Sequence, residues 1–200
     1  MTMKLYITAP SPYARKCRIV AREKGLADRI EEIAVDPYAN APELLASNPL
    51  VQVPTLIAGD GLPLNDSPVI CEYLDELGQG PRLLPEGGPE RLRVRRLETL
   101  GAGALEMGVK LVLEKRRPEH ERSPSWIERW TGNMGRALDA LEAAAPDASR
   151  LDMGVITAGV AVTWIAFRHP DYDWKTGRPG LVALQAALEA RPSFRETTPA

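Results

Sequence analysis

The sequence is poor in several residue types, and each scarcity excludes a class of protein. Only two cysteines and two histidines occur among its 200 residues. The cysteines, Cys17 and Cys71, form no C-x-x-C pair, so the sequence predicts no disulfide framework, zinc site or dithiol redox motif. No spacing of Cys, His and Asp is typical of a metal site. Because both cysteines fall at apolar positions of expected helices, we interpret them as reduced and buried.

The sequence also lacks a strong charge of one sign and a long apolar run. Its formal net charge of −2 argues against nucleic acid or an anionic membrane as the main partner. The longest apolar stretch, residues 154–167, is shorter than the roughly 20 residues that cross a bilayer, and it indicates a buried core helix. No cationic segment with a long apolar region opens the sequence, so we expect no signal peptide and a cytoplasmic location.

The first 78 residues change periodicity often, which indicates a mixture of strands and helices. The expected elements are a strand at 4–8, a helix at 12–25, a strand at 29–35, a short helix at 42–46, a hairpin within 54–66 and a helix at 67–78. The opening strand-helix-strand order predicts a parallel, right-handed crossover. The hairpin, centred on Gly59-Asp60-Gly61, adds an antiparallel edge to the same sheet.

The rest of the chain shows helical periodicity and no convincing strand. Residues 79–88 are rich in glycine and proline, which marks a linker. Beyond them we expect helices at 90–117, 123–145, 154–168 and 180–190. Glycines in the first of these helices mark either a kink or the close approach of another element. The sequence therefore predicts an α/β domain at residues 1–78 followed, after the linker, by an all-α domain at residues 89–200.

Ser-Pro pairs stand at three expected helix starts, at Ser11, Ser67 and Ser123. Serine caps free backbone N–H groups and proline fits the first helical turn, so capping alone explains each pair. Ser11 and Ser67 differ from Ser123 because each follows a strand, at the kind of sheet edge where ligands bind. Pro54 stands just before an expected strand, and a cis Val53-Pro54 bond would leave the Val53 backbone free to pair with an extended ligand.

Three segments in this order carry a specific resemblance. SPYARKCRIVAREKG at residues 11–25, NPLVQVPTLI at 48–57 and LNDSPVICEYLDE at 64–76 closely resemble the glutathione transferase superfamily. The resemblance extends over the whole chain and is strongest to the bacterial and plant branches that use Ser or Cys near the first helix. It implies a thioredoxin-like domain followed by a helical domain, which agrees with the pattern of the residues.

The resemblance implies a role for five residues of the first domain. Ser11 would donate a hydrogen bond to the sulfur of glutathione. Val53, before the cis proline Pro54, would pair through its backbone with the cysteinyl part of the tripeptide. Asp66 and Ser67 would hold the γ-glutamyl amine and carboxylate, since a carboxylate suits an ammonium and a helix N-terminus suits a carboxylate.

Other positions are less settled by the resemblance. Gln52 stands where the family often has lysine, and its neutral amide would bind the glycyl carboxylate with less charge assistance. Tyr6 is the alternative to Ser11, because other branches use a tyrosine near the end of the first strand. Tyr13, Met107 and Leu111 are candidates for the acceptor pocket.

The implied function is a glutathione transferase, in which the glutathione thiolate attacks a small electrophilic or apolar acceptor. Glutathione is then a co-substrate, no metal is required, and the protein is a homodimer. Arginines at residues 91–96 and acidic side chains at residues 72–76 would orient the two subunits. Two alternatives remain: a glutathione-dependent isomerase or disulfide or peroxide reductase, and a non-catalytic binding or regulatory protein, which Gln52 keeps open.

Overall fold

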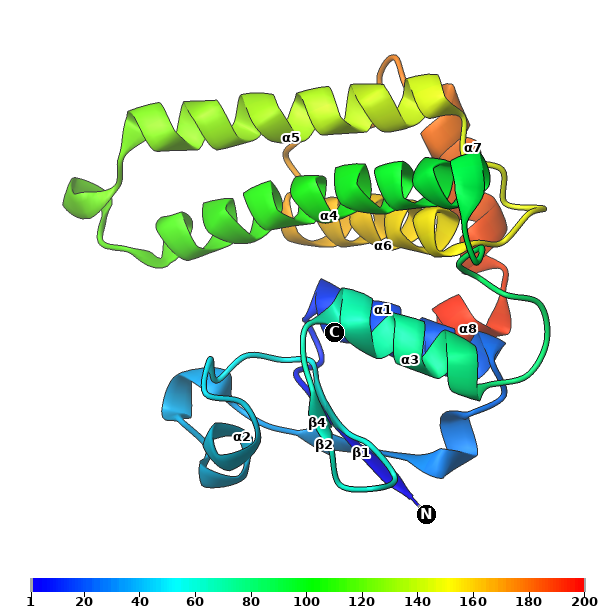
Figure 1. Cartoon of the computed structure of the whole chain (residues 1–200). Helices are drawn as coiled ribbons and strands as arrows, with labels where there is room; N and C mark the ends of the chain where they lie inside the picture. Colours follow the sequence, from blue (N-terminus) through cyan, green and yellow to red (C-terminus); the bar gives the residue numbers. More distant parts are fainter. Residues whose placement is uncertain (1, 200) are drawn as a thin grey trace. The chain divides into compact units, whose positions relative to one another are not determined.

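The computed structural model describes residues 2–199 and divides them into two units (Figure 1). The first unit ends at Leu84 but also includes the chain from Arg191 onward, and the second spans Pro85–Ala190. The first unit contains a mixed sheet covered by helices, and helices and the loops between them make up the described residues of the second. The predicted class, an α/β domain of thioredoxin-like type followed by a helical region, is therefore confirmed.

The sheet of the first unit has four strands in the order β2-β1-β3-β4. Their bounds are Met3–Ile7 for β1, Ile30–Ala34 for β2, Thr55–Ile57 for β3 and Pro63–Leu64 for β4. β1 pairs in parallel with β2 and antiparallel with β3, and β3 pairs antiparallel with β4. The sequence predicted both the parallel crossover and the antiparallel hairpin.

Three α-helices accompany this sheet before the unit boundary. They are α1 at Pro12–Glu23, α2 at Pro42–Ser47 and α3 at Ser67–Leu77, with short 3-10 turns at Ala27–Arg29 and Pro37–Ala39. α1 and α3 pack side by side, and most of their apolar side chains are buried together with those of β1 and β3. Gly25, at φ +66°, follows the last turn of α1, a left-handed conformation that glycine adopts at little steric cost.

A short C-terminal helix, α8 at Pro192–Arg195, completes the first unit. Phe194 is fully buried, and the Arg15 guanidinium lies 5.4 Å from the centre of its ring. Arg15 also donates to the Phe194 carbonyl oxygen at 3.2 Å. Arg191, the residue before α8, donates through Nε and Nη2 to the two carboxylate oxygens of Glu23, at 3.0 and 2.8 Å. These contacts tie the end of the described chain to α1.

This grouping differs from the sequence-based division, which assigned residues 89–200 to one helical domain and ended the helices at residue 190. The periodicity of residues 191–199 is too short to indicate a helix. What assigns these residues to the first unit is tertiary contact with α1, and that contact leaves no local pattern in the sequence.

A buried ion pair fixes the segment that follows α3. Lys24 Nζ lies 3.1 Å from Asp75 Oδ1, and both side chains are almost completely buried. Asp75 also accepts hydrogen bonds from the backbone N–H groups of Leu83 and Leu84, at 2.9 and 3.0 Å. Lys24 donates to the Pro81 carbonyl oxygen at 2.9 Å. The carboxylate of Asp75 is therefore a buried junction between α1, α3 and the start of the expected linker.

The expected charge pairing between subunits stays a prediction. Asp75, expected on an acidic helix face, is buried and satisfied within its own unit. On the basic side, Arg93 pairs with Glu90 and Asp152 at 3.0 and 2.5 Å. Arg95 pairs with Glu98 at 2.7 Å. These three side chains therefore already have partners within the chain.

The second unit consists of four α-helices and one 3-10 turn within its described residues. The helices are α4 at Gly88–Arg116, α5 at Pro124–Ala144, α6 at Met153–Arg168 and α7 at Pro179–Glu189, and the turn lies at Glu119–Glu121. α6 is buried along almost its whole length, as its apolar composition predicted. Asp152 caps it by accepting from the Val155 N–H at 2.8 Å. None of the helices within residues 2–199 is long and apolar enough to span a membrane.

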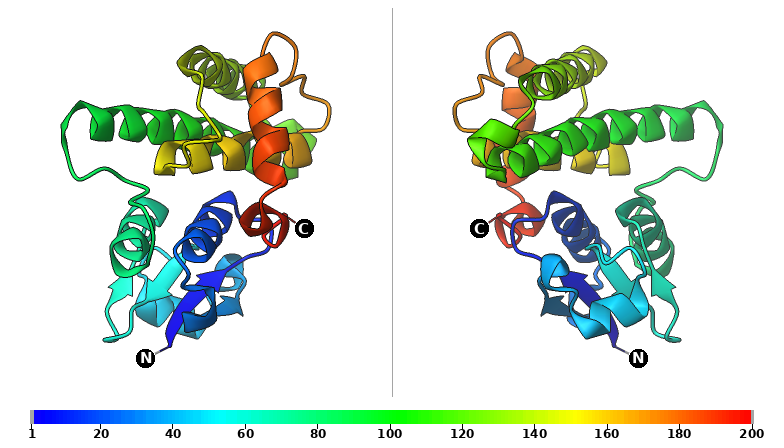
Figure 2. Two further views of the ribbon diagram at one scale, coloured as in Figure 1. Left: turned by 90° about the vertical axis from the view of Figure 1, so that its right-hand side faces the viewer. Right: turned by 90° about the vertical axis from the view of Figure 1, so that its left-hand side faces the viewer.

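Glycines allow α4 and α6 to approach each other closely (Figure 2). A Cβ atom on Gly101 would lie 3.0 Å from Cγ2 of Thr157, and one on Gly108 would lie 2.8 Å from Cζ3 of Trp164. By contrast, a Cβ atom on Gly103 would meet nothing within 4 Å. Of the two explanations that the sequence left open, close approach therefore holds at Gly101 and Gly108.

We expect Gly108→Ala and Gly103→Ala to change stability in opposite directions. At Gly108 the added methyl group meets the rigid, buried ring of Trp164, and overpacking of this kind costs about 1–3 kcal/mol. At Gly103 the methyl group faces open space, so the higher helix propensity of alanine adds about 0.5–1 kcal/mol. Urea unfolding followed by tryptophan fluorescence measures both, because all four tryptophans lie in this unit. Equal effects of the two changes would contradict the close approach.

Candidate functional site

The sheet register brings the predicted site residues of the first unit to one edge of the sheet. Ser11 begins α1 just after the carboxyl end of β1. Tyr6 in β1 pairs with Thr55 in β3, so Pro54 lies at the same edge. β4 runs antiparallel to β3 and returns to this edge, where Asp66 begins α3. The edge therefore combines two helix N-termini with the loop before β3, an arrangement that favours anionic ligands.

Ser11 is held in place as the N-cap of α1. Its Oγ accepts a hydrogen bond from the Ala14 N–H at 3.2 Å, and its own N–H donates to the Thr8 carbonyl oxygen at 3.1 Å. A hydroxyl that accepts in this way keeps its proton for donation and is polarised by the bond that it accepts. Ser11 is half-buried, so its hydroxyl can reach a ligand at this edge. Tyr6, the alternative, is buried within β1.

The loop before β3 presents free backbone groups. The Val53-Pro54 bond is cis, which confirms the prediction. Among residues 2–199, neither the N–H nor the C=O of Val53 has a hydrogen-bond partner. An extended chain could pair with both groups, in the manner of an added strand.

Asn48 positions this loop, and sequence reasoning missed it. Its fully buried side chain donates to the Gln52 carbonyl oxygen at 3.1 Å and to Thr55 Oγ1 at 2.9 Å. Thr55 Oγ1 in turn donates to the Gln52 carbonyl oxygen at 2.8 Å. Between them Val51 has φ +51°, a strained value for a β-branched residue. The exposed Gln52 side chain follows directly. The only sequence signal for Asn48 was its place before a proline at the start of a loop.

At the start of α3 the capping residue is Asp66 and not Ser67. The Asp66 carboxylate accepts a hydrogen bond from the Ser67 N–H, and the Asn65-Asp66 peptide bond is also cis. Ser67 is the first helical residue and is buried. Its hydroxyl makes no hydrogen bond to the described part of the chain. The Asp66 carboxylate and the Ser67 hydroxyl thus lie together at this helix N-terminus, and both can form hydrogen bonds with a ligand.

The three candidates for the acceptor pocket lie in different units. Tyr13 is half-buried in the first turn of α1. Met107 and Leu111 belong to α4 in the second unit. Leu111 is buried, and Met107 is half-buried with its Sδ 3.9 Å from Nδ2 of Asn133. The acceptor pocket therefore stays a prediction.

The two cysteines are unsuited to act as nucleophiles. Both are free and fully buried, with their sulfur atoms 3.7 Å apart, as the sequence predicted. Burial raises the pKa of the Cys17 thiol well above its ordinary value, and the neighbouring Cys71 adds to the effect. Since the thiolate is the reactive form, neither side chain competes with a bound thiol. No cluster of metal-ligating side chains occurs within residues 2–199.

Comparisons with known proteins agree with this geometry. Residues 10–77 match the family model described as glutathione S-transferase, N-terminal domain. The uncharacterized GST-like protein YibF of Escherichia coli K12 is 34% identical to this chain, and the alignment covers 98% of each protein. A probable maleylacetoacetate isomerase of Vibrio cholerae is 30% identical over 76% of this chain and 73% of its own length. A glutathione transferase family member from Pseudomonas fluorescens Pf-5, whose crystal structure contains bound glutathione, is 32% identical to this chain. The two structures superpose over the full length of both chains with a TM-score of 0.95. The chain belongs to the glutathione S-transferase family.

Proposed function

We propose that the chain binds glutathione at this sheet edge and uses Ser11 to stabilise the glutathione thiolate. The thiolate sulfur then attacks the electrophilic atom of a small acceptor, forming a carbon–sulfur bond. In a substitution the leaving group departs with its electron pair, and in an addition the acceptor takes a proton from solvent. The observation that carries the proposal is the fixed Ser11 hydroxyl at the same edge as the free Val53 backbone. The bound glutathione of the Pseudomonas fluorescens relative supports the choice of ligand.

Each end of the tripeptide has a suitable partner. The N–H and C=O of Val53 pair with the cysteinyl residue of glutathione. The Asp66 carboxylate holds the γ-glutamyl ammonium, while the Ser67 hydroxyl and the free N–H groups of α3 hold the γ-glutamyl carboxylate. The Gln52 amide donates to the glycyl carboxylate without a charge of its own. Glutathione is a co-substrate in this scheme, and no step requires a metal.

The hydrogen bond from Ser11 and the N-terminus of α1 are together strong enough to stabilise the thiolate. A cysteine thiol has an ordinary pKa of about 8.5, and lowering it by about 2 units corresponds to roughly 2.7 kcal/mol. A hydrogen bond to a charged group contributes about 1.5–3 kcal/mol, and a helix N-terminus adds about 0.3–1 kcal/mol. Ser11 therefore acts by donating its proton in a hydrogen bond and never ionises.

Two other functions use the same site. An isomerase or a disulfide or peroxide reductase also needs the glutathione thiolate, and the similarity to a probable maleylacetoacetate isomerase favours the former. A non-catalytic binding protein is favoured by Gln52, whose neutral side chain weakens the hold on glutathione. We further propose that the protein is a homodimer. Its support is the set of exposed apolar side chains on the first unit: Tyr38, Leu45, Leu50, Leu62, Val69 and Leu77.

Calorimetric titration with glutathione, followed by turnover assays, tests the function. We expect saturable binding of one glutathione per chain and turnover of aryl halides or α,β-unsaturated carbonyl compounds. Turnover of hydroperoxides or disulfides alone would identify a reductase, and turnover of a cis-alkene substrate an isomerase. Binding without any turnover would identify a binding protein. Absence of glutathione binding would overturn the proposal as a whole.

A further inference from the structure

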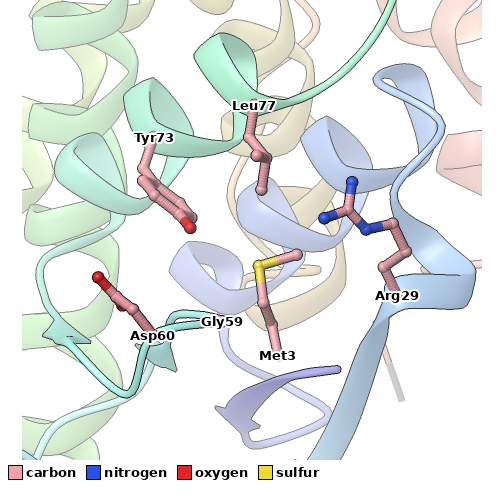
Figure 3. Close-up of a pocket in the computed structure, with 6 residues that line it drawn as sticks. All are labelled: Met3, Arg29, Gly59, Asp60, Tyr73 and Leu77. Carbon is pink, nitrogen blue, oxygen red and sulfur yellow. The ribbon is translucent and has the colours of Figure 1, made fainter. Parts of the chain in front are cut away.

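A pocket lies in the first unit, at the sheet edge opposite the Ser11 site (Figure 3). Its volume is about 360 Å³, and its lining residues are Met3, Arg29, Gly59, Asp60, Tyr73 and Leu77. Met3 opens β1 and pairs with Ile30, the first residue of β2, which Arg29 precedes. Gly59 and Asp60 follow β3, and Tyr73 and Leu77 lie toward the carboxyl end of α3. The proposed glutathione site, by contrast, lies at the amino end of α3.

The pocket has an apolar centre between two opposite charges. Figure 3 shows the Arg29 guanidinium and the Asp60 carboxylate on opposite sides, with the Met3 side chain between them. Met3 is almost fully buried, and Leu77 is 38% exposed above it. The Tyr73 hydroxyl points into the pocket on the side of Asp60. Hydrocarbon suits the centre, because the partly exposed Leu77 side chain gains by being shielded from water.

The polar groups of this pocket retain bonding capacity. Within the described part of the chain, the Arg29 guanidinium and the Tyr73 hydroxyl have no hydrogen-bond or ion-pair partner. Asp60 uses Oδ1 to accept from the Leu62 N–H at 3.1 Å, which leaves its other oxygen for a ligand. A guanidinium fork matches a carboxylate, and a carboxylate beside a hydroxyl matches an ammonium.

We propose that this pocket binds an elongated zwitterion, a molecule with a carboxylate at one end, an ammonium at the other and an apolar chain between them. The carboxylate pairs with Arg29, the ammonium with Asp60 and Tyr73, and the apolar chain lies over Met3 and Leu77. The volume of the pocket is at the lower end of the range for small-molecule sites, about 300–1,000 Å³, which suits a ligand of this size. The proposal does not depend on glutathione binding.

A series of ω-amino acids tests the proposal on the full chain. Binding of 4-aminobutanoate, 6-aminohexanoate and 8-aminooctanoate is measured by NMR chemical-shift titration. Hexanoate and hexylammonium serve as probes with one charge, and leucine as a probe with both charges on one carbon atom. We expect saturable binding that is strongest for one chain length and about threefold to fivefold weaker for each single-charge probe, since each lacks one solvent-exposed ion pair.

Variants at Arg29 and Asp60 test whether the ω-amino acid binds in this pocket. Arg29→Gln and Asp60→Asn should each weaken binding of the best ω-amino acid by about threefold to fivefold. Asp28→Asn is the matched control, because Asp28 is an exposed acidic neighbour of Arg29 that does not line the pocket. All three substitutions are at exposed positions, and circular dichroism checks that the variants are folded. The affinity for glutathione, where the chain binds it, should be the same in all of them.

Several results would overturn the proposal. These are absence of saturable binding by every ω-amino acid, equal binding of hexanoate or hexylammonium, an equal loss in Asp28→Asn, or displacement of the ω-amino acid by glutathione. The last would place the ligand in the Ser11 site. Failure of glutathione to bind would leave this proposal intact and would count only against the proposed function.

Discussion

Ser11→Ala is expected to lower turnover at pH 7 by about 25-fold while changing the affinity for glutathione much less. A donor that lowers the thiol pKa from about 8.5 to about 6.5 raises the thiolate fraction at pH 7 from about 3% to about 76%, and its loss reverses that gain. The rest of glutathione keeps its contacts with the Val53 backbone, Asp66 and Ser67, so most of the binding free energy is unchanged. The substitution therefore lowers the rate of the reaction and leaves the affinity for glutathione largely unchanged.

The absorbance of the bound thiolate, measured against pH, gives the direct test. In Ser11→Ala its midpoint should move upward toward the pKa of free glutathione, because the stabilising donor is gone. Ser123→Ala is the matched control: it alters another Ser-Pro helix start whose side chain does not cap its helix. Ser11→Gly separates the two roles of the residue, since glycine replaces a serine cap at a loss of only a few tenths of a kcal/mol. An unchanged midpoint in both Ser11 variants would reject Ser11 and favour Tyr6.

Asp75→Ala is expected to lower the free energy of unfolding by about 3–5 kcal/mol, because it leaves the buried Lys24 ammonium without its ion-pair partner. It also removes the acceptor for the Leu83 and Leu84 N–H groups. Glu76→Ala is the control on the same helix. Glu76 is exposed and lies 3.3 Å from Arg82, and a surface pair of this kind contributes about 0–1 kcal/mol.

Urea unfolding followed by circular dichroism measures both changes, and hydrogen exchange at the Leu83 and Leu84 amides reports on the local effect. Exchange at these two amides should accelerate in Asp75→Ala and not in Glu76→Ala. Asp75→Asn should lie between wild type and Asp75→Ala, since its amide oxygen still accepts a hydrogen bond. If Asp75→Ala and Glu76→Ala had equal effects, Asp75 would not be the junction that the contacts indicate.

The sequence predicted the main elements of both units because each has a local signal. β1 is a short, largely apolar run, Gly25 follows the end of α1, and α6 is apolar over almost its whole length. The cis Val53-Pro54 bond and the site roles of Ser11 and Ser67 came from the resemblance, which relies on three motifs in a fixed order. Periodicity and motif order are both readable without knowledge of which distant segments meet.

What the sequence did not predict depends on contacts that its patterns do not encode. Asp75 has the sequence context of an exposed helix residue, and its burial becomes favourable through Lys24, just after α1, and the Leu83 and Leu84 N–H groups. Asn48 supports the site loop through side-chain hydrogen bonds to Gln52 and Thr55, which no spacing rule anticipates. Asp66 caps α3 in place of Ser67 because the chain reaches the helix in an extended conformation at Asp66, one residue earlier than the Ser-Pro pair suggested.

The contacts of α8 with α1 have a consequence for the order in which the protein is made. On the ribosome, domains generally fold as units as the nascent chain emerges, beginning with the N-terminal one. Here the first unit requires Phe194 and Arg191, which are translated after the whole of Pro85–Ala190. The helical second unit is therefore the first that can be complete. Until translation reaches residue 194, the surface of α1 around Arg15 and Glu23 lacks these contacts.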